Sequence, residues 1–170
     1  MVIGGTFRDV AIRAASTRDI DVVLIDHAAL PDDRMHQAGF RRVAGSPHAW
    51  RLGSTGHVVD VEVAAVASST EAAGPFSVAF QNAQTARIEG IEVTVPRIED
   101  YVILKLLAAA AERRRTARDL ADIQYAFEAF PQNAHLSLVA LRARLRDLYG
   151  IGGQRLKDLV AMLRQVPRPR

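Results

Sequence analysis

The order of hydrophobic and polar positions changes character near residue 95. Before that point, short apolar runs alternate with polar gaps, which is typical of a sheet-containing domain. After Pro96, apolar positions recur at the helical period. In the first part, the pattern predicts apolar or strand-like segments over residues 1–3, 19–25, 40–44, 49–52 and 57–66, and a hairpin over 86–95.

Helices are predicted from their capping and breaking residues. Thr6, with Asp9 three residues later, predicts a helix over about 7–15, and residues 31–39 a short helix that ends at Gly39. Residues 67–84 give no readable pattern. The period after Pro96 predicts four helices, over about 98–114, 117–129, 135–148 and 153–166.

These elements predict an α/β (α+β) fold. A mixed β-sheet flanked by helices is expected over residues 1–95, and a helical C-terminal part over 96–170 is expected to pack on it as one compact unit. The chain has 170 residues, of which 49% are hydrophobic, so it can bury a sizeable core. The pattern holds neither an apolar run long enough for a membrane span nor a secretory leader.

Composition narrows the chemistry. The sequence has no cysteine, which excludes disulfides and thiolate chemistry and fits a cytoplasmic protein. The net charge is +3, and arginines cluster at residues 112–118, 142–146 and 164–170. Two interpretations of these clusters stay open: they bind a polyanionic partner, or they are the solvated faces of helices.

Two aspartates stand one residue apart at the start of a predicted strand. Side chains at i and i+2 share a face of a strand, so Asp19 and Asp21 repel each other unless a cation lies between them. Asp60 lies between valines in a later apolar run and is a candidate third carboxylate, with Glu62 as a substitute or helper. Mg²⁺ takes carboxylates, waters and substrate phosphates, so a third acid on a neighbouring strand would complete a site for two ions.

A glycine pair precedes the first predicted helix. Gly4 and Gly5 allow close approach of a phosphate, and a helix N-terminus offers N–H donors and the positive end of its dipole. Thr17, near the first aspartate, is a further donor to a phosphate oxygen. These parts suit phosphoryl or nucleotidyl transfer. The alternative is a tight turn and an acidic strand edge without chemistry.

These residues resemble a known family. GGTFRD and TRDID, residues 4–9 and 17–21, are similar to the first motif of the DNA polymerase beta-like nucleotidyltransferase superfamily. The pattern resembles the GGxxRD…DxD signature of CCA-adding enzymes and bacterial poly(A) polymerases. Its TxDxD portion equally resembles the abortive-infection, AbiEii-type nucleotidyltransferases, some of which are toxins of toxin–antitoxin pairs. The resemblance implies that Asp60 is the third carboxylate and that Arg8 belongs to the nucleotide site.

A second match lies in the helical part. The segment resembles the KxxA…RxxxRDxxD motif of the AbiEii-type group, carried by Lys105, Ala108, Arg114, Arg118, Asp119 and Asp122. No segment resembles the later motifs of CCA-adding enzymes, which favours the AbiEii-type branch. The match implies that Lys105 binds triphosphate and that Asp119 orients it or acts as a base. The residues alone equally permit a capping box from Thr116 to Asp119 and a helical ion pair between Arg118 and Asp122.

The sequence therefore predicts an enzyme, a Mg²⁺-dependent nucleotidyltransferase that moves a nucleoside monophosphate from an NTP to an acceptor hydroxyl on RNA or protein. Two Mg²⁺ ions, or Mn²⁺ in their place, are expected at Asp19, Asp21 and Asp60, and Asp60 is also expected to activate the acceptor. A cognate antitoxin or toxin protein is an expected partner. The alternative is an inactive protein of the same fold whose basic helices bind RNA or a protein.

Overall fold

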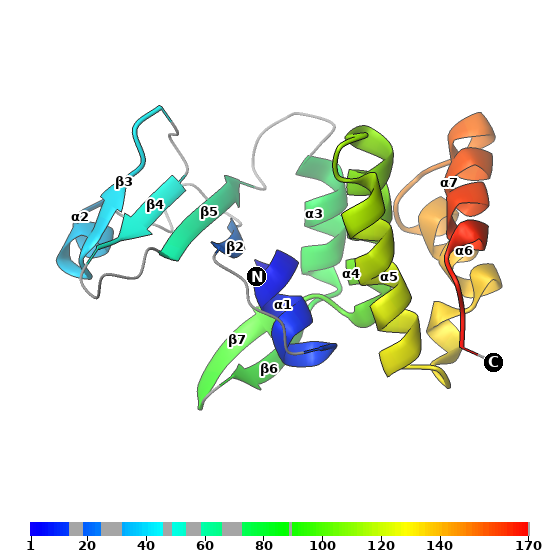
Figure 1. Ribbon diagram of the computed structural model, residues 1–170, viewed down its shortest axis with the longest axis horizontal. Coiled ribbons are helices and arrows are strands. Elements are labelled where there is room, and N and C mark those ends of the chain that lie inside the picture. Colours follow the sequence, from blue (N-terminus) through cyan, green and yellow to red (C-terminus); the bar gives the residue numbers. More distant parts are fainter. Residues whose placement is uncertain are drawn as a thin grey trace. The chain divides into compact units, whose positions relative to one another are not determined.

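The computed structural model describes most of the chain, namely residues 1–13, 19–24, 32–45, 49–53, 59–65, 73–88 and 90–169. Thr17 lies outside the described residues, and so do the side chains of Asp19, Asp60 and Glu62, whose backbone is described. The chain folds as two compact units, Met1–Val95 and Pro96–Arg170 (Figure 1). Their boundary coincides with the change of period in the sequence.

The first unit contains a five-stranded sheet. Its strand order is β1-β2-β5-β4-β3, made of β1 (Val2–Ile3), β2 (Asp19–Leu24), β5 (Val59–Ala65), β4 (Ala49–Leu52) and β3 (Phe40–Arg42). The central pair β2 and β5 is parallel, and the other neighbours are antiparallel. Each of these strands lies within a segment that the sequence pattern predicts, and the mixed sheet is confirmed.

The apolar face of this sheet packs around one tryptophan. Trp50 is buried against Ile20, Val22, Leu24, Phe40 and Met35, the last of which comes from α2 (Asp32–Gln37). The ring of His36 meets Trp50 edge-on, and the guanidinium of Arg42 lies 4.7 Å from the centroid of the indole. Successive positions of a strand alternate between the two faces of a sheet. The face opposite Trp50 therefore contains the odd-numbered positions of β2, β3 and β4 and the even-numbered positions of β5.

Three further elements complete the first unit. They are α1 (Gly4–Ala11), α3 (Ala73–Gln81) and a hairpin of β6 (Gln84–Ile88) and β7 (Ile91–Val95), which turns at Gly90 with φ of 85°. The hairpin is confirmed. Helix α3 lies within residues 67–84, for which the sequence pattern predicted no element, because Pro75 interrupts the helical pattern there. A proline in the first turn is compatible with a helix, since the N–H it lacks has no partner there.

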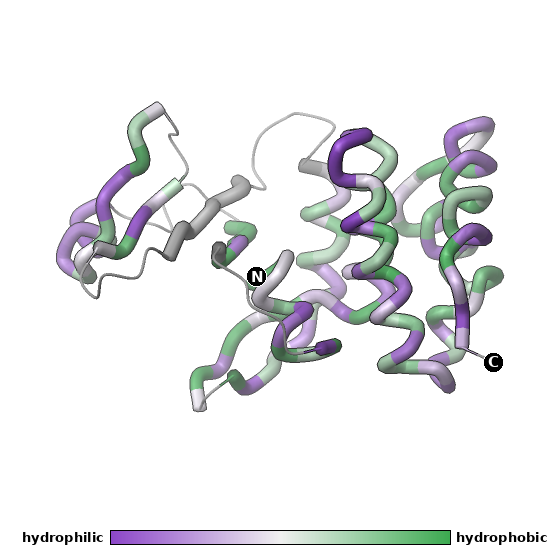
Figure 2. Tube along the Cα trace, viewed as in Figure 1, coloured by the Kyte–Doolittle hydropathy of each residue, from purple (hydrophilic) through white to green (hydrophobic). Residues whose placement is uncertain are grey.

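The second unit is helical. It consists of α4 (Ile98–Ala111), α5 (Thr116–Ala129), the short 3-10 helix η2 (Ala134–Leu136), α6 (Leu138–Asp147) and α7 (Gly153–Gln165). Hydrophobic and hydrophilic residues alternate along these helices (Figure 2). The leucines at positions 106, 141, 145, 159 and 163 are buried, so the predicted helical period reflects a real core. Across the described ranges, no helix combines the length and apolar character needed to cross a membrane.

Candidate active site

The acidic positions of the sheet lie next to one another in the backbone register. Asp19 of β2 is the direct partner of Asp60 of β5, and Asp21 is the partner of Glu62. Direct partners share a face of a sheet, as do positions i and i+2. The four positions therefore form a block, which we call the carboxylate row, on the face opposite Trp50. This adjacency agrees with the expectation that Asp60 is the third carboxylate on a neighbouring strand, although 34 residues, 25–58, separate β2 and β5.

The N-terminus of α1 meets this row at Asp21. Gly4 has φ of 64°, which glycine adopts without strain, and a Cβ built on it would overlap the carboxylate of Asp21 and lie 2.7 Å from its Cγ. Gly4 thus permits a carboxylate to approach the first turn of a helix whose N-cap, Ile3, has an apolar side chain. The positive end of the helix dipole favours negative charge at this place.

The predicted capping of α1 is wrong. The helix begins at Gly4 and not after Thr6, so both glycines lie in its first turn and Thr6 is its third residue. Asp9 does not cap the helix either, because its carboxylate accepts a hydrogen bond from Nε of Arg8 at 2.9 Å. Both side chains of this pair are largely buried. The glycines supply the backbone freedom at the helix start that the prediction assigned to a turn before the helix.

The chemistry of the carboxylate row fits a hard divalent cation. Carboxylate oxygens are the donors that Mg²⁺ prefers, and several of them at adjacent positions need a cation to offset their repulsion. Asp21 is the member of the row whose side chain is described. Among the described side chains, no three His, Asp or Glu residues gather as a metal site, and the side chains of Asp19, Asp60 and Glu62 are not among them.

In the second unit, the predicted lysine contacts both predicted aspartates. Nζ of Lys105 in α4 lies 3.0 Å from Oδ1 of Asp119 and 2.7 Å from Oδ2 of Asp122, both in α5. All three side chains are buried, and Nε of Arg115 lies 3.6 Å from the second oxygen of Asp119. We call these residues the lysine cluster. Breaking such a cluster is costly, because it leaves a buried charge without its partner.

Among the described residues, the structure contains neither of the two purely structural arrangements considered for this segment, a capping box from Thr116 to Asp119 and an ion pair between Arg118 and Asp122. Arg115 is the N-cap of α5 and no side chain caps that helix, so Thr116 and Asp119 do not form a capping box. The hydroxyl of Thr116 instead donates to the carbonyl of Ala109 at 2.8 Å. Asp122 pairs with Lys105 on the neighbouring helix. Tertiary contacts between α4 and α5, which a local sequence pattern cannot show, decide these partners.

A second buried network was not predicted from the sequence. Asp100 of α4, which is fully buried, accepts two hydrogen bonds from Arg144 of α6, at 2.7 and 2.6 Å, and one from the hydroxyl of Tyr149 at 2.8 Å. Burial raises the pKa of Tyr149, and the charge of Asp100 raises it further. Burial alone would lower the pKa of Arg144, but its hydrogen bond to Asp100 and the charges of Asp100 and Glu99 raise it. The sequence feature that could have indicated this network is the pair of acids, Glu99 and Asp100, within the otherwise apolar start of α4.

Comparison with known proteins decides the family. The family model of the AbiEii nucleotidyl transferase toxin, of type IV toxin–antitoxin systems, matches residues 7–168. The chain belongs to the AbiEii family. This membership confirms the resemblance drawn from the DxD and KxxA motifs. It also assigns the chain to the nucleotidyltransferases and to the toxins of toxin–antitoxin systems at the level of the family.

One solved structure supports the fold. A crystal structure of an antigenic nucleotidyltransferase-like protein from Paracoccidioides brasiliensis matches with a TM-score of 0.55 and 21% sequence identity. The match covers 99% of this chain and 85% of the other. At that identity it shows a nucleotidyltransferase-like fold, as predicted. No curated protein matches the chain.

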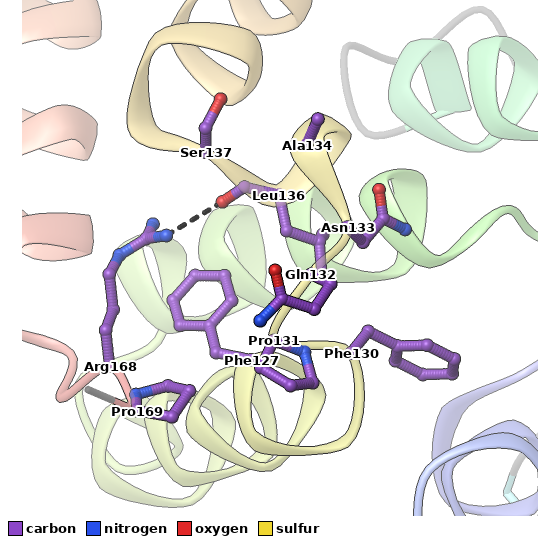
Figure 3. Close-up of a pocket in the computed structure, with 10 residues that line it drawn as sticks. All are labelled: Phe127, Phe130, Pro131, Gln132, Asn133, Ala134, Leu136, Ser137, Arg168 and Pro169. Carbon is purple, nitrogen blue, oxygen red and sulfur yellow. Dashed lines mark hydrogen bonds between the residues drawn. The ribbon is translucent and has the colours of Figure 1, made fainter.

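The helical unit of this AbiEii-family chain also contains a hollow of about 250 Å³ between α5, η2 and the segment after α7. Arg168 reaches over the ring of Phe127, with its guanidinium carbon 4.0 Å from the centroid, and donates to the carbonyl of Leu136 at 2.9 Å (Figure 3). Burial lowers the pKa of Arg168. These contacts are directed inward, so Arg168 fastens the end of the described chain onto the helices.

Proposed function

We propose that this chain is a Mg²⁺-dependent nucleotidyltransferase that moves a nucleoside monophosphate from an NTP to an acceptor hydroxyl on RNA or protein. The observation that carries the proposal is the carboxylate row with the glycine start of α1 against Asp21. The reaction forms a bond between the acceptor oxygen and the α-phosphorus and breaks the bond from that phosphorus to pyrophosphate. The acceptor proton passes to a base.

The residues of the first unit divide the work in this proposal. Asp19, Asp21 and Asp60 hold two Mg²⁺ ions, or Mn²⁺, and Asp60 also takes the acceptor proton. Bound in this way, the metal stabilises the charge that develops on the attacking and leaving oxygens. The N–H groups of Gly4 and Gly5 and the hydroxyl of Thr17 bind the phosphates, because the helix start favours anions. Arg8 contributes through its position in α1, where it holds Asp9.

Lys105 is proposed to bind the triphosphate, and its contacts favour one of the two roles considered for Asp119. A base must reach the proton that it removes. Asp119 is fully buried and bound to Lys105, so we assign it the orientation of the lysine and not proton transfer. The ammonium has three N–H donors, of which one is donated to Asp119, and it also forms an ion pair with Asp122 at 2.7 Å. A remaining donor is the one proposed to meet a phosphate oxygen.

We also propose that the chain acts as the toxin of a two-component pair with a cognate antitoxin. The support is its membership of a family of type IV toxin–antitoxin toxins. Expression of the chain alone is expected to arrest growth of a bacterial host, and Asp21→Asn is expected to abolish the arrest. Growth arrest that persists unchanged with Asp21→Asn would separate toxicity from the carboxylate row.

The central experiment is a transfer assay with each of the four α-labelled NTPs, offered to cellular RNA and protein. Asp19→Asn and Asp21→Asn are each expected to lower transfer about 100-fold or more, equivalent to about 2.7 kcal/mol of transition-state stabilisation. The matched control is Asp33→Asn, because Asp33 is an exposed acid on α2 in the same unit. Transfer that survives unchanged in both row variants would contradict the proposed site, and absence of transfer by the wild type would favour the alternative, an inactive protein that binds RNA or a partner through its basic helices.

A further inference from the structure

The hollow of the helical unit combines an apolar wall with one cation. It lies where the connection from α5 to α6 meets the segment after α7, within the second unit alone (Figure 3). The apolar wall consists of Phe127, Phe130, Pro131 and Leu136, and Arg168 is the charged member of the described lining. Pockets of this mixed composition are typical of ligand sites, and a volume of about 250 Å³ suits a group smaller than a drug-sized ligand.

The charge of Arg168 has no counter-ion among the described residues. Its guanidinium stacks on the ring of Phe127 and donates to the carbonyl of Leu136, and both of these partners are uncharged. No described carboxylate forms an ion pair with it, and burial lowers its pKa without an opposing contribution from an acid. A guanidinium has five N–H donors, so most of them stay available for an anion.

The other polar side chains at the hollow also offer donors. The side-chain oxygen of Asn133 accepts from N of His135 at 2.9 Å, and Oγ of Ser137 accepts from N of Ala140 at 3.2 Å. These bonds use acceptor atoms and leave the side-chain N–H and O–H groups without a partner in the described chain. Gln132 is exposed and adds a second carboxamide. The open hydrogen-bonding capacity of the lining therefore matches an anion.

The charge of the whole helical unit favours an acidic protein as the source of that anion. Residues 96–170 contain 14 Lys and Arg and 8 Asp and Glu, so their formal net charge is +6. Residues 1–95 contain 8 basic and 11 acidic residues and carry −3. A positive surface attracts an acidic partner before contact. A nucleic-acid backbone needs several cations at successive phosphates, whereas the hollow presents one cation beside aromatic and proline rings, a composition typical of the core of a protein interface.

We propose that this hollow docks an acidic segment of a protein partner, with one Asp or Glu carboxylate bound to Arg168. The planar guanidinium can bind a carboxylate with two parallel hydrogen bonds, and Gln132 supplies a further donor. An apolar side chain next to that acid packs on Phe130 and Pro131, which the fold leaves partly or fully exposed. The site lies in the helical unit and uses no residue of the carboxylate row, so it is independent of the proposed transfer reaction.

The test is fluorescence anisotropy of the full chain with a labelled peptide, Pro-Leu-Glu-Leu-Pro, blocked at both ends. A matched peptide has Gln in place of Glu. The variant is Arg168→Gln, and the control is Arg164→Gln, an exposed arginine of α7 that does not line the hollow. We expect the wild type and the control to bind the Glu peptide with equal affinity, roughly millimolar or tighter, and Arg168→Gln to bind it about tenfold or more weakly. The Gln peptide should bind the wild type about tenfold more weakly as well.

A second variant keeps the contacts of Arg168 intact. Gln132→Glu preserves the shape of an exposed side chain and adds a carboxylate to the lining, which competes with that of the peptide. It should weaken binding of the Glu peptide about tenfold, since a charged hydrogen bond contributes about 1.5–3 kcal/mol. Circular dichroism confirms that each variant is folded before its affinity is compared.

Four results overturn the inference. Binding of the Glu peptide weaker than roughly millimolar, or equal binding of the Glu and Gln peptides, means that the hollow holds no carboxylate. An equal loss in Arg164→Gln and Arg168→Gln assigns the binding to the general positive charge of the unit. Displacement of the Glu peptide by single-stranded RNA or inorganic phosphate at the peptide's own concentration makes this a phosphate site. None of these measurements involves Mg–NTP or transfer, so they stay distinct from failure of the proposed function.

Discussion

Acidic residues serve opposite purposes in the two units of this chain. In the helical unit, the buried acids Asp119 and Asp122 face Lys105, and Asp100 faces Arg144. In the sheet unit, Asp19, Asp21, Asp60 and Glu62 are one another's neighbours in the register, and a basic position, Arg51, enters only at the margin. The helical acids are neutralised by basic side chains of the same unit, whereas we propose that the carboxylate row binds cations from outside the chain. Acids of the same type thus form ion pairs in one unit and, in the proposed function, bind metal ions in the other.

The largest expected effect comes from breaking the lysine cluster. Lys105→Met leaves Asp119 and Asp122 buried without their cation, and it should lower the free energy of unfolding by about 3–5 kcal/mol. Urea unfolding followed by circular dichroism measures this loss. The triple variant Lys105→Met/Asp119→Leu/Asp122→Leu should recover stability to within about 1 kcal/mol of the wild type, because apolar groups can replace a buried ion pair.

The triple variant also separates the two roles of Lys105. If the lysine binds triphosphate, the stable triple variant still shows a raised KM for NTP in the transfer assay. A wild-type KM in that variant would make the cluster purely structural and would contradict the proposed role of Lys105.

A methyl group at the start of α1 should damage the sheet site more than it damages the fold. Gly4→Ala places a Cβ onto the carboxylate of Asp21, so transfer should fall about 100-fold, as expected for misplaced reacting groups. The control is Gly90→Ala, which shares the positive φ but whose Cβ meets no atom of the described chain within 4 Å. Both variants should lose about 1–2 kcal/mol of stability from backbone strain, and only the first should lose transfer. Equal transfer in the two would contradict the close fit of Gly4 and Asp21.

The second network predicts a dependence on alkaline pH. Tyr149→Phe removes a hydrogen bond to buried Asp100 and should cost about 1–2 kcal/mol at pH 7. The pKa of Tyr149 is raised in the folded state, so the folded chain holds this proton more tightly than the unfolded chain does. Its stabilisation is therefore present below about pH 10, the unfolded pKa, and declines as the pH rises above that value. Urea titrations from pH 8 to 11 should show a steeper decline for the wild type than for Tyr149→Phe, and parallel curves would contradict this account.

The smallest effect is expected at the surface of the sheet unit. Asp32 and Arg42 form an exposed ion pair, so Asp32→Asn should change stability by less than about 1 kcal/mol. Thermal unfolding at low and high salt measures this effect. A loss comparable to that of Lys105→Met would remove the contrast between exposed and buried pairs on which the comparison rests.

Local patterns in the sequence predicted most of the elements, whereas the expectation that Asp60 joins Asp19 and that Asp119 orients Lys105 came from the chemistry of the motifs and the resemblance to a family. Period and alternation located β4, β5 and the four long helices, because each of these buries one face along a continuous segment. Helix α3 was missed because Pro75 obscured its start, and Thr6 was mistaken for a cap that the glycine start of α1 makes unnecessary. The adjacency of Asp19 and Asp60, and the contacts of Lys105 with Asp119, depend on packing between segments far apart in sequence.

The most direct test of the carboxylate row is Mn²⁺ binding in the presence of a nonhydrolysable NTP, measured by electron paramagnetic resonance. Mn²⁺ reports on a site built for Mg²⁺, because both ions favour oxygen ligands. We expect the wild type and Asp33→Asn to bind Mn²⁺ equally, and Asp21→Asn to bind it at least tenfold more weakly. Unchanged Mn²⁺ affinity in Asp21→Asn would contradict the account, since the row would then not be the metal site.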